Sequence, residues 1–278
     1  MTTTLRPAEP LQQNPDGTRS RRYQVCVNSR PVGRVRLGTE PVFGDAVARI
    51  MSLRIEEPDR RRGRGTVAAL AAEEIARSWG CRRIEASVPA DPGADAAFRL
   101  ATALGYVVRN YAMAKVLGQG DTPPVLPEGS HARPMTDAEY GPWSVKSEAD
   151  YAQSWAERGL PEAEARAKAA GDRAALLPDG LRTEGMLLSV LEHRGAPVGT
   201  LWLAVRGERA FVFDLEVGAA HRGQGHGRSL MRLAEAQAVA AGKRAVGLNV
   251  FTGNTPAERL YASLGYRTTR YAMYKHLL

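Results

Sequence analysis

The chain of 278 residues contains little cysteine, few aromatic residues and no long apolar run. Cys26 and Cys81 are its only cysteines, and with no CxxC motif or histidine cluster the sequence indicates neither a disulfide framework nor a zinc site. No segment approaches the run of about 18 apolar residues that a membrane helix requires. The first twenty residues are polar and lack the apolar core of a signal peptide. We therefore expect a cytoplasmic protein with no membrane partner and no bound metal.

Positive charge is concentrated in the first part of the chain. The net charge is +8, and residues 1–120 contain 19 Lys and Arg against 12 Asp and Glu, whereas residues 121–278 contain 19 against 18. A basic half raises the question of nucleic acid. However, its densest basic run, 60–64, lacks interleaved aromatic residues on which bases stack. We expect no nucleic-acid partner, and the run is either an anion site or a solvated surface.

Two glycine motifs of the form Arg-x-x-Gly-x-Gly lie 162 positions apart. A β-rich apolar run precedes each motif (50–55 and 210–217), and a helical pattern follows it. Glycine lets the backbone approach an anion closely, and the first turn of a helix offers N–H groups without partners. Each motif therefore predicts a phosphate-binding loop. The motif residues are Arg60, Gly63 and Gly65 in the first copy, and Arg222, Gly225 and Gly227 in the second.

Two further segments repeat in the same order. Residues 99–117 align with 259–277 without a gap, with ten identical positions out of nineteen. The tripeptide PVG occurs at 31–33 and again at 197–199. Internal repetition of this kind indicates a duplicated domain. The chain is long enough for two cores, because domains of roughly 100 to 150 residues are common.

The sequence NTPAERLYASLGY at 254–266 follows the second motif after a helix and a strand. This order resembles the acetyl-CoA-dependent N-acetyltransferases of the GNAT superfamily, over residues 21–117 and from 132 to the C-terminus. A Rossmann-like nucleotide binder is disfavoured because no ribose-binding acid follows at the expected spacing. The tandem layout is similar to that of mycothiol synthase, whose C-terminal copy is the active one. The resemblance implies an α/β (α+β) class with two tandem GNAT folds, each a mixed, mostly antiparallel central sheet flanked by helices.

The expected organisation is asymmetric. We predict a disordered tail at 1–20, a truncated and degenerate GNAT-like domain at 21–117, a Gly- and Pro-rich linker at 118–131 and a complete catalytic domain at 132–278. The helices between the first two strands of a GNAT domain help form the acceptor pocket, and only the second copy has room for them. A capping box at Thr136 to Glu139 predicts the start of the first of these helices.

The helix after each glycine motif is predicted to pack on its sheet through a defined face. In the first copy that face contains Val67, Leu70, Ala71 and Ile75. In the second copy it contains Leu230, Leu233, Ala234 and Ala238.

The resemblance also implies the roles of residues in the second copy. Tyr261 is expected to act as the general acid that protonates the departing thiolate. Glu216 is expected to act as the base, with Asp214 or a bound water as alternatives. The side chain of His226 is expected to face solvent. The expected cofactor-binding residues are Leu215, Val217, Arg222, Gly223, Gln224, Gly225, His226, Gly227, Arg228, Ser229, Asn254 and Tyr261.

The first copy has lost this chemistry, since Ala101 aligns with Tyr261 and Arg54 with Glu216. The copy keeps its glycine loop, so it remains a second possible cofactor site. That site would consist of Arg60, Arg62, Gly63, Arg64 and Gly65.

The resemblance therefore implies that the protein is an N-acetyltransferase that uses acetyl-CoA, or another short acyl-CoA. Its acceptor is a primary amine of a small molecule or peptide, of unknown identity, which attacks the thioester directly in the second copy. Acidic and aromatic residues between 148 and 164 would suit a cationic amine, or are simply a solvated helix face. Two alternatives are a lysine or N-terminal protein acetyltransferase that docks through the basic first copy, and a non-catalytic acyl-CoA-binding regulator. We expect a monomer or homodimer.

Overall fold

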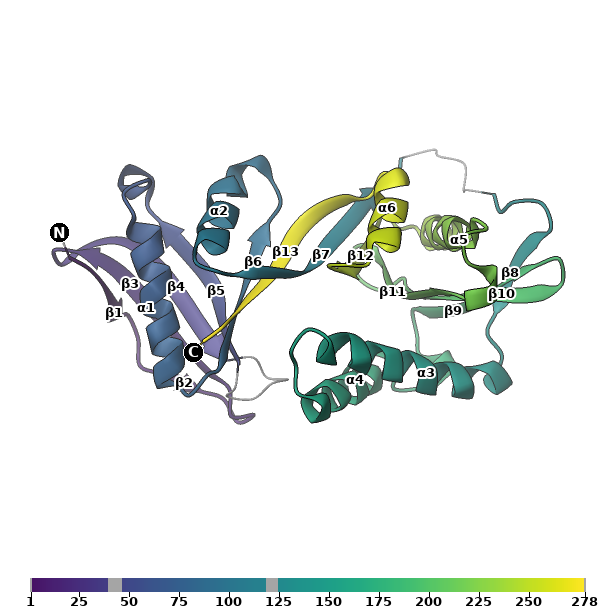
Figure 1. Ribbon diagram of the computed structural model, residues 1–278, viewed down its shortest axis with the longest axis horizontal. Coiled ribbons are helices and arrows are strands. Elements are labelled where there is room, and N and C mark those ends of the chain that lie inside the picture. The colour runs from purple at the N-terminus through teal and green to yellow at the C-terminus, as the bar shows by residue number, and fades with distance from the viewer. Residues whose placement is uncertain (1, 40–46, 119–124, 278) are drawn as a thin grey trace. The chain divides into compact units, whose positions relative to one another are not determined.

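The computed structural model describes residues 2–39, 47–118 and 125–277 (Figure 1). The chain divides into two compact units. The first unit contains Met1–Tyr111 together with Thr269–Leu278, and the second contains Ala112–Thr268. Among the described residues, no helix is long and apolar enough to cross a membrane.

The first unit is a mixed sheet whose strands run in the order β1-β3-β4-β5-β6-β13. Its neighbouring strands pair antiparallel, apart from the parallel pair of β5 with β6. Helix α1 packs on β1, β4 and β5, and α2 adds Phe98 and Ala101 to the same hydrophobic cluster (Figure 1). The elements are β1 (Thr3–Pro7), β2 (Gln12–Gln13), β3 (Arg19–Val27), β4 (Arg30–Thr39), β5 (Val47–Ile55), α1 (Arg64–Ser78), β6 (Arg83–Pro89), α2 (Asp95–Ala103) and the last strand, β13 (Arg267–His276).

Residues 3–7 were expected to belong to a disordered tail, but they form strand β1. This strand pairs with β3, from Thr3 opposite Val27 to Pro7 opposite Tyr23. A single five-residue segment carries too weak a pattern to predict a strand, and β3 supplies the hydrogen-bonding edge that stabilises it. The first copy therefore has an opening strand inside the predicted tail, while short β2 stands where the second copy has two helices.

Helix α1 buries a face that overlaps only in part with the one predicted, since Ile75 packs against the core as expected. The residues against the sheet are Ala68, Ala72 and Ala76, each fully buried, whereas Val67 and Leu70 are 40% and 43% exposed. Alanine lets a helix lie close to a sheet, so the contact surface need not carry the larger apolar residues. The corresponding prediction for the second copy is confirmed, because Leu230, Leu233, Ala234 and Ala238 are all buried in the helix that follows its glycine motif.

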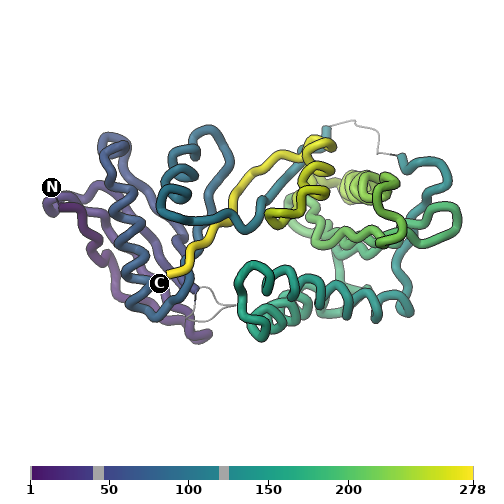
Figure 2. Tube along the Cα trace, in the orientation of Figure 1, coloured from purple at the N-terminus to yellow at the C-terminus, as the bar shows by residue number. Residues whose placement is uncertain are grey.

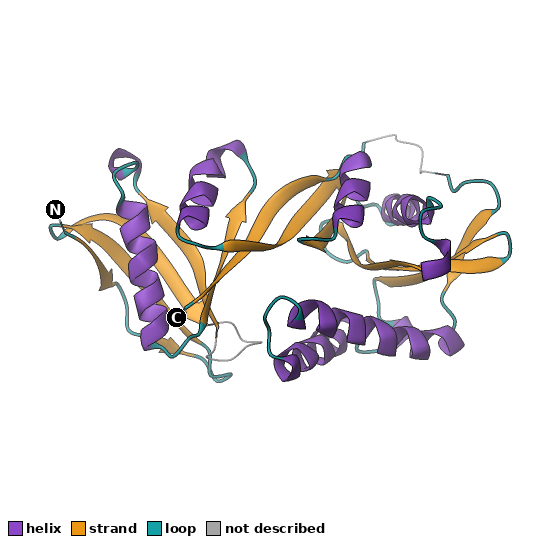
Figure 3. Cartoon of the chain, viewed as in Figure 1, coloured by secondary structure: helices purple, strands orange, loops and turns teal. Residues whose placement is uncertain are grey.

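The second unit has strand order β7-β12-β11-β10-β9-β8, to which β7 contributes its residues from Ala112 onward. Helices α3 and α4 pack together on one face of the sheet, and α5 covers the other (Figure 3). The capping box at Thr136 and Glu139 opens α3 as predicted. The predicted linker is shorter than 118–131, because β8 already begins at Ser130; residues 119–124 lie outside the described residues. The elements are β7 (Val107–Val116), β8 (Ser130–Pro134), α3 (Asp137–Ala156), α4 (Glu162–Leu176), β9 (Met186–His193), β10 (Ala196–Ala204), β11 (Ala210–Val217), α5 (His226–Ala240), β12 (Ala245–Phe251) and α6 (Thr255–Ser263).

The last strand of the chain completes the sheet of the first unit. Strand β13 pairs with β6 from Arg270 to His276. Its path to the C-terminus is the yellow end of the trace in Figure 2. Its Lys275 Nζ lies 2.7 Å from Oε2 of Glu73, a buried carboxylate on α1. The second unit has the matching arrangement, with Lys115 of β7 placed 2.8 Å from the buried Glu235 of α5. Each unit thus depends on a strand that the other copy's sequence supplies.

This exchange predicts that a substitution near the C-terminus destabilises the first unit. Lys275→Met leaves the Glu73 carboxylate buried without its cation, which typically costs about 3 kcal/mol or more. Glu74→Gln removes an exposed pair with Arg77 on the same helix, and should cost at most about 1 kcal/mol. Denaturant unfolding measures both, and hydrogen exchange should show the Lys275→Met loss in α1 and β6. Equal stability of the two variants would contradict the conclusion that the first unit depends on β13.

Candidate active site

A wedge opens between β11 and β12 in the second unit. The parallel pairing runs from Ala210 opposite Val246 to Val212 opposite Leu248, while β11 continues to Val217. A bulge at Phe213 coincides with the end of the pairing, since the register with β10 shifts between Asp214 and Val212. Bulges bend and twist a strand, which turns the end of β11 away from β12. The predicted residues Leu215 and Val217 lie on this diverging segment.

The first unit has the same wedge. Strands β5 and β6 pair only as far as Ile50 and Ala86, and the register with β4 shifts at Met51. Met51 lies 162 positions before Phe213, so the bulge is part of the duplicated scaffold.

The glycine loop of the second unit leads directly into α5. Gly225 is the residue before the helix, and its φ of 86° is one that residues with a side chain rarely adopt. No side chain caps this end of α5, so the first N–H groups of the helix can bind an anion. Arg222 fixes the loop by donating from Nε to the Val217 carbonyl, 3.3 Å away. The residues present therefore fit the pyrophosphate of a phosphorylated cofactor.

The remaining residues predicted for the cofactor have definite places. Gly223, Gln224 and Arg222 are exposed on the loop. Asn254 caps α6, because its Oδ1 accepts a hydrogen bond from the Ala257 N–H at 3.3 Å. Four further predicted residues, His226, Gly227, Arg228 and Ser229, form the first turn of α5.

The glycine loop of the first unit has the same backbone features as that of the second, but its arginine side chains have different partners. Gly63 precedes α1 with a φ of 72°, and Arg60 donates to the Ile55 carbonyl at 2.9 Å. Arg64 is buried in an ion pair with Asp59, which also binds Arg30. The Arg64 guanidinium is therefore engaged within the protein, and the exposed arginines of this loop are Arg60, Arg61 and Arg62.

Two carboxylates follow the bulge on β11 and lie on the same face of the strand, since side chains alternate. Glu216 Oε1 is 2.6 Å from Lys146 Nζ on α3. Asp214 Oδ2 accepts a hydrogen bond of 3.3 Å from the Ser147 hydroxyl, also on α3. Burial raises the pKa of Asp214, and the charge of Glu216 raises it further. Helix α3 thus supplies a cation and a donor to the pair.

Tyr261 on α6 is 8% exposed. Burial and the nearby charge of Asp214 raise the pKa of its hydroxyl to about 12. The phenol therefore keeps its proton at neutral pH. In the first copy the positions of Asp214, Glu216 and Tyr261 hold Ser52, Arg54 and Ala101, so no equivalent constellation exists there.

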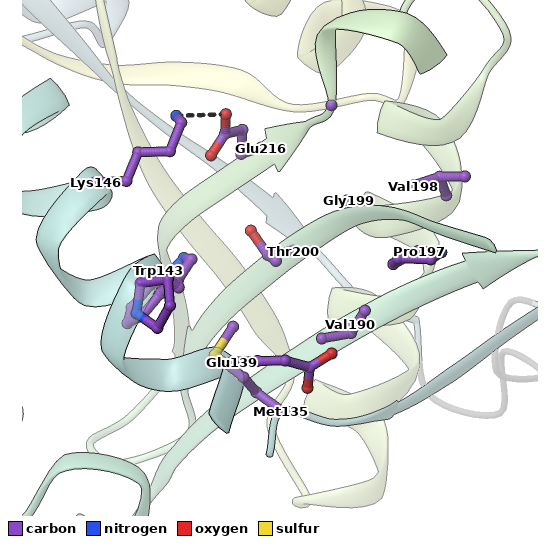
Figure 4. Close-up of a pocket in the computed structure, with 12 residues that line it drawn as sticks. Met135, Glu139, Trp143, Lys146, Val190, Pro197, Val198, Gly199, Thr200 and Glu216 are labelled. Carbon is purple, nitrogen blue, oxygen red and sulfur yellow. Dashed lines mark hydrogen bonds and ion pairs between the residues drawn. The ribbon is translucent and has the colours of Figure 1, made fainter. Parts of the chain in front are cut away.

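A cavity of about 330 Å³ lies between α3 and the strands β9, β10 and β11 (Figure 4). Glu216 is at one side of it, next to Lys146, and Thr200 stands directly opposite Glu216 in the strand register. The Thr200 hydroxyl oxygen is buried and has no hydrogen-bond partner among the described residues. The other lining residues are Met135, Glu139, Pro142, Trp143, Val190, Pro197, Val198, Gly199 and Gly218.

Sequence reasoning missed Lys146, Trp143 and Thr200, because only tertiary packing brings α3 to the strands. The repeated PVG tripeptide was one sequence signal of this cavity, because its glycine lies where two strands approach closely. A side chain at Gly199 would collide with the Glu216 carbonyl, and Gly33 stands in the same relation to Arg54. The glycine permits the close strand approach that forms the cavity wall.

His226 is buried, contrary to the expectation that it faces solvent. Its ring lies 5.1 Å from that of His193 and 6.3 Å from that of His221. Burial lowers the pKa of His226, and the two neighbouring imidazoles lower it further. The ring of His226 therefore packs beside two other imidazoles and is not turned to solvent.

Comparison with known proteins agrees with this geometry. Residues 3–106 and 147–266 match the Acetyltransferase (GNAT) family, and the chain therefore belongs to that family. Over 107 residues it is 32% identical to the uncharacterized N-acetyltransferase YycN of Bacillus subtilis (strain 168), covering 37% of this chain and 69% of that protein.

Two solved structures share the fold along most of the chain. A GCN5-related N-acetyltransferase from Sphaerobacter thermophilus matches with a TM-score of 0.58 and 20% identity, over 92% of this chain and 80% of that chain. A tandem GNAT protein from the clavulanic acid biosynthesis pathway matches with a TM-score of 0.53 and 23% identity, over 96% and 85%. The protein is thus an acetyltransferase of the GNAT type with two tandem GNAT folds.

The histidine cluster predicts a pH-dependent stability. Because the folded-state pKa of His226 is below the unfolded value of about 6.5, its contribution is complete above that pH and is lost as pH falls toward the folded pKa. His226→Leu should flatten the decrease of unfolding free energy between about pH 7 and pH 5. His276→Leu, at an exposed position, is the control and should retain the wild-type slope. Parallel pH profiles for wild type and His226→Leu would show that His226 titrates alike in both states.

Proposed function

We propose that the second unit transfers an acetyl group from acetyl-CoA to the primary amine of a small molecule by direct attack, and that the first unit does not catalyse transfer. One observation carries this proposal. The second unit combines a carboxylate pair, a protonated phenol that is coupled to Asp214 and a glycine loop that leads into an uncapped helix, whereas the first copy has Ser52, Arg54 and Ala101 at the corresponding positions.

The residues that would hold acetyl-CoA are those of the wedge and the loop. The backbone N–H groups at the start of α5 would bind the pyrophosphate, with Arg222 and Arg228 beside them. The diverging edge of β11, at Leu215 and Val217, would offer backbone groups to the rest of the cofactor. When bound, acetyl-CoA supplies the acetyl group as a thioester.

The amine must lose a proton to attack, and the structure favours Asp214 as the acceptor of that proton. Glu216 already holds the Lys146 ammonium, whereas Asp214 has a pKa raised by burial and by the Glu216 charge. A carboxylate whose pKa lies closer to neutrality is the better base at neutral pH. In this proposal Glu216, which lines the cavity, attracts the ammonium form of the acceptor, and Asp214, which does not line it, takes the proton through a bound water.

Tyr261 would return a proton to the departing thiolate sulfur. Its raised pKa keeps the hydroxyl protonated until the thiolate forms. The Asp214 charge contributes to that shift, so acid and base are electrostatically coupled. A non-catalytic acyl-CoA regulator would need neither group, which argues against that alternative.

The cavity has room for a small acceptor. Its volume of about 330 Å³ is near the lower end of the range of about 300–1,000 Å³ seen for small-molecule sites. The two ion pairs of Lys146, with Glu216 and Asp150, border it on the α3 side.

Removing the Tyr261 hydroxyl tests the acid. Tyr261→Phe keeps the ring but deletes the proton donor, so turnover should fall by about 10²- to 10⁴-fold while acetyl-CoA affinity changes little. Thiol release under saturating conditions measures turnover, and calorimetry measures affinity. Tyr266→Phe, which alters a neighbouring buried phenol, is the matched control and should retain most activity. Wild-type turnover in Tyr261→Phe, with chemistry limiting the rate, would exclude this residue as the acid.

The pH dependence of kcat/KM separates the two carboxylates. The base must be ionised, so wild-type activity should decrease as pH falls through the raised pKa of Asp214, above its ordinary value of about 3.9. Asp214→Asn should lower activity greatly and abolish this acidic limb. Glu216→Gln should chiefly raise the KM for the amine and keep a limb, shifted to lower pH because the adjacent charge is gone. If Glu216→Gln abolished the acidic limb and Asp214→Asn kept it, Glu216 would be the base.

A further inference from the structure

We infer that the acceptor is an apolar α-amino acid, with its ammonium at Glu216 and its carboxylate on Lys146. This inference rests on the proposed function and adds the chemical class of the acceptor. It assigns Lys146 the role of selecting a substrate that carries a carboxylate next to the reacting amine.

The ion pair at the cavity is the first support. Lys146 Nζ lies 2.6 Å from Glu216 Oε1 and also holds Asp150 on its own helix. An ammonium group that arrives at Glu216 is therefore placed close to the Lys146 ammonium. Like charges at such a distance repel, and solvent at the half-exposed Lys146 side chain screens this repulsion only in part. A carboxylate on the carbon that bears the amine removes this repulsion, because it pairs with Lys146 while the ammonium pairs with Glu216.

The other charged groups near the cavity are already engaged. Glu139 accepts hydrogen bonds from Arg133 and from the Thr136 N–H, and these bonds lower the pKa of Glu139 to about 2. Arg173 packs behind the Trp143 ring, 4.8 Å from its centroid, and does not line the cavity. Asp214 is bonded to Ser147 and does not line the cavity. Lys146 and Glu216 are consequently the pair of opposite charges in the cavity lining.

The rest of the cavity suits an apolar side chain. Met135, Trp143 and Val190 belong to one buried hydrophobic cluster, and prolines 142 and 197 complete the apolar walls. Figure 4 shows Trp143, Thr200 and Glu216 around the same space. The unpartnered Thr200 hydroxyl, directly across the strand pair from Glu216, can meet a polar atom of the bound amino acid. A pocket with apolar walls and a few convergent polar groups is typical of small-ligand sites.

The test compares three amines of nearly equal shape: L-phenylalanine, L-phenylalaninamide and phenethylamine. Thiol release with acetyl-CoA gives kcat/KM for each amine, with wild type, Lys146→Met and the control Lys243→Met. Lys243 lies after the end of α5 and donates to the Gly207 carbonyl, away from the cavity lining. Wild type should prefer phenylalanine to the other two amines.

Lys146→Met should lower kcat/KM for phenylalanine by about 10- to 100-fold, as expected for loss of a hydrogen bond between charged groups. The same variant should leave phenethylamine unchanged or improve it, because the repelling ammonium is gone. Lys243→Met should behave as wild type.

Preference of wild type for phenethylamine, an equal loss for all three amines in Lys146→Met, or activity confined to amines outside this set would overturn the inference and leave the proposed function standing. If acetyl-CoA binds but neither these three nor a broad amine panel releases thiol, the proposed function itself fails.

Discussion

The bulge at Phe213 is the constraint on which the rest of the candidate site depends. It ends the pairing of β11 with β12 and separates the two strands. The separation exposes a strand edge leading to the glycine loop, and it places Asp214 and Glu216 on the face that α3 covers. Without this one extra residue, β11 would continue its ladder and the wedge would close. The site is therefore a consequence of backbone geometry before any side-chain chemistry is added.

Both copies have this backbone geometry, and they differ in the side chains and helices that surround it. The bulge, the loop glycine with positive φ and the uncapped helix recur in the first unit. The acid, the carboxylates and the helices that form the cavity do not. The first copy nevertheless supplies Lys115, which pairs with Glu235 in the second unit. We interpret its retention as structural, because the second unit requires a strand from the first copy's sequence.

The sequence predicted the fold well where signals were local or repeated. The glycine loops, the helix faced by Leu230 and Ala234, and the capping box at Thr136 all follow from short patterns. Strand β1 was missed because five residues beside a polar stretch carry no clear period. The face of α1 was misassigned in part, because small alanines, rather than Val67 and Leu70, pack against the sheet. The exchange of β13 was not predicted, because the sequence of a single strand does not specify which sheet edge it pairs with.

The candidate site was predicted only in part, for a related reason. Residues on β11 and α6 were found through motif spacing, which fixes their positions along the chain. Lys146 and Thr200 come from α3 and β10, and only packing brings them to Glu216. The burial that raises the pKa of Asp214 is likewise a tertiary property.

The most direct test of the account is the rate of acetyl transfer after the same substitution is made in each loop. Gly63→Glu and Gly225→Glu both place a negative side chain on a residue with positive φ, 72° and 86°, at the start of a helix. Gly242→Glu introduces the same backbone strain, at a φ of 71°, beyond the other end of α5, and controls for instability. The account predicts that Gly225→Glu abolishes thiol release while Gly63→Glu and Gly242→Glu retain it. Loss of activity in Gly63→Glu, with activity preserved in Gly225→Glu, would contradict the assignment of catalysis to the second unit.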